Sequence, residues 1–151
     1  MKKIVLLIVI LLLTGCTFNK SDKFYLNNKY YNKGEYIKVD SKELESIKDE
    51  SMIIYTYNNF CNLPIHCENV FKEFMDKYKI DFISIPFMEF KKTSFYSSVS
   101  YAPSVIIIHK GKIVDYLKAD SDSDYSKYQD VNEFDKWISN YINLAKATSI
   151  I

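Results

Sequence analysis

The residues of this sequence best suited to covalent chemistry are its three cysteines, Cys16, Cys61 and Cys67. Cys61 and Cys67 are separated by only five residues, so one short segment carries two thiols. Such a pair can close a structural disulfide, or it can exchange disulfides with other proteins through a thiolate. Disulfides persist mainly outside the cytoplasm, so these alternatives depend on where the chain resides.

The N-terminal residues have the layout of a secretory signal. Lys2 and Lys3 precede an apolar run over residues 4–13, and small residues follow it. A bilayer core requires roughly 20 apolar residues, so this run is too short for a transmembrane helix. The tetrapeptide Leu-Thr-Gly-Cys that ends at Cys16 resembles the bacterial lipobox. The resemblance implies that Cys16 receives a diacylglycerol, with fatty acids such as palmitate, and becomes the N-terminus.

We therefore expect an exported lipoprotein with three parts. Residues 1–15 are expected to be the signal peptide, 16–28 the lipidated N-terminus and tether, and 29–146 the folded domain. Two or more acyl chains hold a protein to a bilayer without spanning it. The predicted location is therefore the extracytoplasmic face of the cell membrane, with the protein as a monomer.

The charge balance argues against one class of partner. The chain has 20 basic and 19 acidic residues, and none of the basic ones is arginine. Nucleic-acid binding requires a basic surface, on which arginine is the usual base-reading residue, so we expect no nucleic-acid partner. Cys61, His66 and Cys67 offer three metal ligands without an evident fourth or a zinc spacing, so we expect no metal and no other cofactor.

Apolar patterning predicts the elements that position the cysteines. Continuous β-branched and aromatic runs predict buried strands, and apolar residues at helical spacing predict helices. Asp40 with Glu43, and Asp130 with Glu133, form capping-box patterns that predict helix starts. The expected strands are 35–39, 52–57, 82–85, 104–109 and 112–118. The expected helices are 40–49, about 63–78, 87–98 and a last one after residue 130. The acidic, serine-rich segment 120–129 is expected to be a loop.

The resulting order of elements is βαβαβαββα. Strands that alternate with helices, followed by a hairpin and a final helix, predict an α/β domain with a mixed sheet. Helices are expected on both faces of that sheet, and the apolar stripe of the helix after the cysteine pair is expected to pack on it.

Three segments of this pattern resemble the thioredoxin superfamily. Residues 55–61 are similar to the strand and loop that lead to the family's first active-site cysteine, and residues 110–114 to its closing hairpin. Residues 101–108 are similar to the family's cis-proline and the strand after it. The resemblance extends from about residue 35 to 141. It implies a thioredoxin-like fold in which Pro103 follows a cis peptide bond and faces the cysteines, and in which the Ala102–Pro103 backbone pairs with a bound substrate chain.

The cysteine pair departs from the family's pattern. In the family two residues separate the cysteines and tryptophan precedes the first, whereas here five residues separate them and Phe60 precedes Cys61. Proline favours the first position of a helix, so the helix is expected to begin near Leu63 or Pro64. Cys61 would then lie in the preceding loop and could fold back over the first helical turn to reach Cys67, which makes a disulfide feasible.

The positions of the two thiols predict different roles. Cys61 lies near a helix N-terminus, where the positive end of the dipole favours the thiolate, so it is expected to be the attacking thiol. Cys67 lies on the apolar stripe, so it is expected to be the buried, resolving thiol.

Two functions remain open from the sequence. The first is a membrane-tethered thiol–disulfide oxidoreductase that acts on exported proteins or peptides. The second is a non-catalytic thioredoxin-like lipoprotein that binds a partner in the same groove and has a structural Cys61–Cys67 disulfide.

Overall fold

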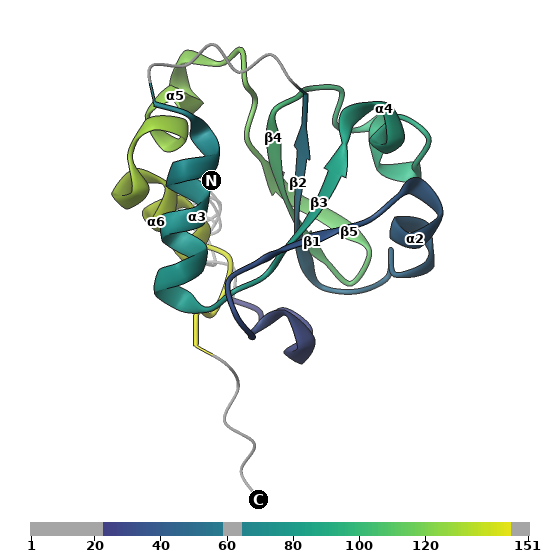
Figure 1. Ribbon diagram of the computed structural model, residues 1–151, viewed down its shortest axis with the longest axis horizontal. Coiled ribbons are helices and arrows are strands. Elements are labelled where there is room, and N and C mark those ends of the chain that lie inside the picture. The colour runs from purple at the N-terminus through teal and green to yellow at the C-terminus, as the bar shows by residue number, and fades with distance from the viewer. Residues whose placement is uncertain (1–22, 59–64, 146–151) are drawn as a thin grey trace, which may run out of the picture.

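The strands form one mixed, five-stranded sheet. A computed structural model describes residues 23–58 and 65–145 (Figure 1). The sheet has the order β1-β3-β2-β4-β5, in which β1, β3 and β2 are parallel and β4 and β5 are antiparallel to their neighbours. The strands are β1 (Tyr36–Lys38), β2 (Met52–Tyr57), β3 (Phe82–Pro86), β4 (Ser104–His109) and β5 (Lys112–Tyr116).

Helices cover both faces of this sheet, as the order of elements predicted. Figure 1 shows α3, α5 and α6 on one side and α2 and α4 on the other. The helices are η1 (Asn28–Tyr30), α2 (Ser41–Ser46), α3 (Cys67–Tyr78), α4 (Phe87–Phe90), η2 (Ser94–Ser97), α5 (Asp122–Gln129) and α6 (Val131–Ser139). The expected α/β fold with a mixed sheet is therefore confirmed.

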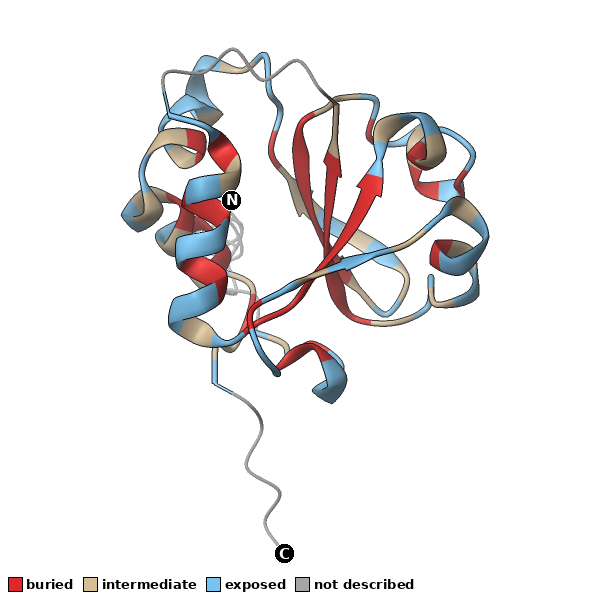
Figure 2. Cartoon of the chain, viewed as in Figure 1, coloured by how far each residue is buried: buried red, intermediate tan, exposed pale blue. Residues whose placement is uncertain are grey.

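The two central strands form the middle of the core. Residues 52–55 of β2 and 105–108 of β4 are buried, because helices shield both of their faces (Figure 2). An aromatic cluster joins α3 to α6, in which the ring of Phe134 lies 4.8 Å from that of Phe71 and 5.2 Å from that of Phe74. The apolar stripe predicted for α3 is the surface that makes this contact.

Two expected elements differ in the structure. The helix expected over 87–98 is divided into α4 and η2. The Thr93 hydroxyl donates to the carbonyl of Phe90 at 2.8 Å, which satisfies a group that a continuing helix would use. The expected loop 120–129 contains helix α5. Acidic residues in its first turn suit the helix dipole, and Lys127 pairs with Asp124 one turn earlier.

The folded part of the chain begins before the domain boundary that was expected between residues 28 and 29. The backbone N–H of Phe24 donates to Tyr141, the Phe24 carbonyl accepts from Asn143, and the Phe24 ring lies 4.1 Å from that of His109. Leu26 is buried. Residues 24–26 thus belong to the fold, beside the end of β4 and the chain that follows α6.

A buried carboxylate fixes the turn that leads into β1. Asp81 is 3% exposed, and its Oδ1 accepts from the backbone N–H groups of Lys33, Gly34 and Glu35 at 3.2, 2.8 and 2.9 Å. Gly34 has φ +79°, and a Cβ there would lie 2.4 Å from the carbonyl oxygen of Met75. The turn therefore needs both the glycine and the carboxylate.

An Asp81→Ala variant is expected to be destabilised by about 3 kcal/mol, because it leaves the buried N–H of Gly34 and two partly buried N–H groups without their acceptor. Urea unfolding monitored by circular dichroism would measure the change. Asp122→Ala, at an exposed position, is the matched control and should shift the free energy of unfolding by less than about 0.5 kcal/mol. Equal effects of the two substitutions would contradict this assignment.

Candidate active site

The Ala102–Pro103 step lies at the end of the sheet where β2 ends. Thr56 in β2 pairs with Ser104 in β4, so the residues just after β2 are next to those just before β4. The Asn58 side-chain amide donates to the carbonyl of Ala102 at 3.0 Å. The Ala102–Pro103 peptide bond is cis, as the resemblance implied. The chain thus enters the segment that contains Cys61 directly beside the cis-proline.

Cys67 is the first residue of α3 and is fully buried. Its burial is what the apolar stripe predicted. The predicted helix start near residue 63 or 64 is wrong for α3, which begins at Cys67. Ile65 and His66, just before it, are not helical. Cys61 lies outside the described residues, as does Cys16, so the pairing and the roles of the thiols stay predictions.

Tyrosines from the sheet surround the buried end of this site. The Tyr55 hydroxyl donates to Glu68 Oε1 at 3.1 Å, and the Tyr36 ring lies 5.6 Å from that of Tyr55. Burial raises the pKa of Tyr55, and repulsion from Cys67 when it is ionised and from Glu68 adds to this effect. Burial, followed by the same two charges, also raises the pKa of Tyr36. Both phenols therefore stay neutral at physiological pH and can act as hydrogen-bond donors near Cys67.

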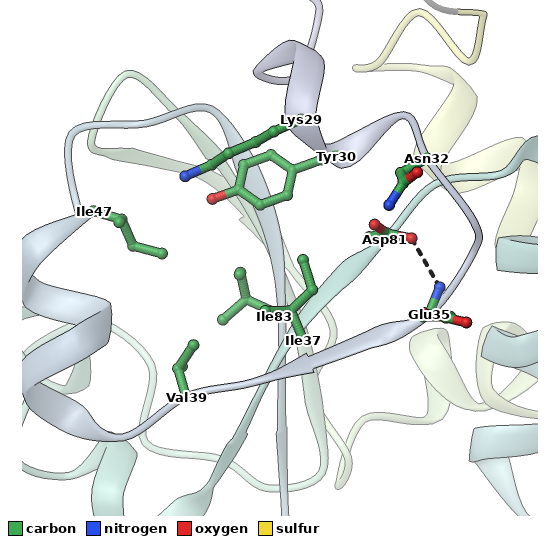
Figure 3. Close-up of a pocket in the computed structure, with 9 residues that line it drawn as sticks. All are labelled: Lys29, Tyr30, Asn32, Glu35, Ile37, Val39, Ile47, Asp81 and Ile83. Carbon is green, nitrogen blue, oxygen red and sulfur yellow. Dashed lines mark hydrogen bonds between the residues drawn. The ribbon is translucent and has the colours of Figure 1, made fainter.

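Two pockets open on opposite faces of the edge strand β1. The first, of about 300 Å³, adjoins α3 and is lined by Tyr36, Lys38, Tyr55, Tyr57, Glu68 and Ser84. The second, of about 320 Å³, is lined by Lys29, Tyr30, Asn32, Glu35, Ile37, Val39, Ile47, Asp81 and Ile83 (Figure 3). Side chains alternate between the faces of a strand, so only the first pocket lies on the face that carries Cys67.

Helix α5 contributes two residues that the sequence did not predict for the site. The Tyr128 hydroxyl donates to the carbonyl of Pro103 at 2.9 Å. The Gln129 side chain accepts from the N–H of Ile65 at 3.0 Å and donates to the carbonyl of Ile65 at 2.9 Å. These partners are 25 and 64 residues apart in sequence. No local pattern could have found them, because the segment lacks helical amphipathicity and was expected to be a loop.

The fold and the cis-proline together define a thioredoxin-like domain. A solved protein with a thioredoxin fold and a proposed oxidoreductase activity is 14% identical, covers 67% of this chain and 91% of its own, and superposes with a TM-score of 0.50. The oxidised thioredoxin of Plasmodium falciparum is 16% identical, covers 72% of this chain and 98% of its own, and has the same TM-score. These likenesses concern the fold. No protein-family model matches the sequence, and no curated protein matches it either.

Proposed function

We propose that this protein is a thiol–disulfide oxidoreductase, anchored to the extracytoplasmic face of the cell membrane by a lipid on Cys16. The observation that carries the proposal is the position of Cys67 and cis-Pro103 at the same end of a thioredoxin-like sheet. The sequence places a second thiol, Cys61, in the segment between β2 and α3. Exported proteins or peptides with reducible disulfides are the substrates that fit this arrangement.

The reaction consists of two thiol–disulfide exchanges. The Cys61 thiolate attacks one sulfur of a substrate disulfide, which breaks that bond, forms a mixed disulfide and releases the other substrate sulfur as a thiolate that takes up a proton. Cys67 then loses its proton and attacks the Cys61 sulfur, which closes the Cys61–Cys67 disulfide and releases the substrate's second thiol. The substrate gains two electrons and the cysteine pair loses them. A further dithiol protein or small thiol must reduce the pair, and the reverse sequence oxidises a substrate.

The membrane anchor is the second part of the proposal. Within residues 23–58 and 65–145, none of the helices combines the length and apolar character that crossing a bilayer demands. The support for the anchor is the lipobox-like sequence that ends at Cys16.

A binding function is the alternative, and the complete burial of Cys67 is compatible with it. A buried sulfur suits a structural disulfide as well as a resolving thiol. In that case the cis-proline end of the sheet would bind a partner without exchange.

Titration of the purified protein against glutathione, followed by thiol alkylation and mass spectrometry, distinguishes the two functions. An exchanging Cys61–Cys67 pair is expected to have a potential of roughly −120 to −270 mV. A structural disulfide is expected below about −300 mV, and a potential in that range would favour the binding function.

A further inference from the structure

The end of the sheet opposite the cis-proline has a basic surface, which we call the basic end. It is formed by residues 23–35, 47–51 and 79–81, which precede the three parallel strands, and by the β4–β5 turn 109–112. Backbone hydrogen bonds join the first of these segments to the second and third, and the second to the turn. The four segments therefore form one surface, at the lower end of the sheet in Figure 1.

Lysines outnumber acidic residues in the basic end. It contains seven lysines, all of them exposed, and four acidic residues, of which Asp81 is buried. By contrast, the segment 117–124, at the far end of β5, has three aspartates and one lysine. The charge of the domain is thus unevenly distributed, and the basic end suits an anionic partner.

Two of these lysines adopt a backbone conformation that lysine rarely takes. Lys79, which follows α3, has φ 54°, and Lys110, in the β4–β5 turn, has φ 48°. Glycine or asparagine is the usual residue at such positions, because a Cβ disfavours positive φ. The salt bridges within residues 23–58 and 65–145 use other lysines, such as Lys29, which pairs with Glu50. The ammonium groups of Lys79 and Lys110 can therefore bind an external anion, which gives a reason for lysine at positions that suit glycine.

The chain also enters the fold at the basic end. Phe24 packs on His109, and the next residue, Tyr25, is 48% exposed. Cys16, the proposed site of the lipid, is only eight residues before Phe24 in the sequence. Tyrosine is favoured at the interface of a bilayer, and anionic headgroups attract lysines that lie close to them. The partner that best fits this surface is therefore the bilayer that would hold the lipid.

We propose that the basic end binds the anionic headgroups of the bilayer surface, an inference that rests on the proposed anchor. Each lysine held near such a surface strengthens binding by a few-fold. The seven lysines exceed the four acidic residues by three, which is too few to retain the protein alone. The headgroup contacts add to the acyl chains and keep the domain against the surface.

The test measures trace acetylation of individual lysines by mass spectrometry, in lipidated protein reconstituted into vesicles. With one third phosphatidylglycerol in phosphatidylcholine, Lys33 and Lys48 are expected to react about fivefold more slowly than in pure phosphatidylcholine, because the headgroups cover them. Salt at about 1 M, where the Debye length is about 3 Å, should abolish this protection without releasing the protein. Lys91 and Lys118, at the cis-proline end, should react equally in both kinds of vesicle.

A double variant tests the two left-handed lysines. Lys79→Asn with Lys110→Asn removes two charges, and asparagine tolerates the left-handed conformation, so the two turns are retained. Protection of the remaining lysines of the basic end should fall to less than about twofold. The matched control is Lys91→Gln with Lys118→Gln, which removes two exposed lysines from the other end of the sheet and should leave the protection at about fivefold.

Equal acetylation of the wild-type protein in the two kinds of vesicle would overturn the inference, as would equal protection in both double variants. Failure of the proposed anchor is distinct, because the protein would then not associate with pure phosphatidylcholine vesicles. An unlipidated chain would be titrated directly with the same two kinds of vesicle. A lack of preference for the anionic vesicles in that titration would again contradict the assignment of the basic end.

Discussion

A Cys67→Ser variant is expected to accumulate a mixed disulfide in which the substrate remains attached to Cys61. The substitution removes the thiol that resolves this intermediate and leaves the attacking thiol in place. The wild-type protein should release its substrate and show almost no adduct. In Cys67→Ser the adduct is therefore expected to rise from a trace to a major fraction of the protein. Non-reducing electrophoresis and mass spectrometry after acid quenching would detect the adduct on an oxidised model peptide.

The companion variants make this prediction specific. Cys61→Ser should lower exchange to the uncatalysed background and trap nothing, and the double variant should behave like it. Serine is close in size to cysteine, so the buried site of residue 67 stays filled. If Cys67→Ser folds and yields no adduct, and the wild-type potential lies below about −300 mV, the binding function is the better account.

Cys16→Ala is expected to remove the protein from the membrane fraction or to stall it as an unprocessed precursor. Without the thiol no diacylglycerol can be attached, and the acyl chains are the anchor proposed for the mature protein. Fractionation of cells and the intact mass of the protein would show the loss. Cys61→Ala is the matched control, since it removes a cysteine without touching the anchor and should remain at the membrane. Unchanged fractionation and mass in Cys16→Ala would refute the lipoprotein assignment.

The parts of the fold that sequence predicted well are those with strong local signals. The bounds of β2 and β4 match the expected strands, because both are continuous apolar runs bounded by polar or turn residues. The capping box of Asp40 and Glu43 is present at the start of α2. At the start of α6, Asp130 accepts from the N–H of Asn132, and the helix follows as predicted.

The errors occurred where long-range contacts decide the structure. In α5 the burial of Tyr128 and the bonds of Gln129 to Ile65 stabilise a helix whose own residues are mostly polar. Beyond the end of α4, the backbone N–H of Ser94 likewise donates to Glu45, 49 residues away in the sequence. For the site, sequence located Pro103 and the burial of Cys67, since family resemblance and helical spacing both point to them. It could not reveal the roles of Tyr128 and Gln129 in α5, because their bonds to Pro103 and Ile65 are tertiary contacts.

The packing of Phe24 determines which end of the domain would lie nearer the bilayer if Cys16 carries the proposed anchor. Phe24 contacts His109, where β4 ends, whereas Pro103 precedes the opposite end of the same strand. Residues 16–22 can extend at most about 25 Å, so a lipid on Cys16 would keep this end of the domain near the bilayer surface. The cis-proline end would then project into the aqueous space. In such an orientation the cis-proline end would meet soluble exported proteins more readily than thiols embedded in the lipid.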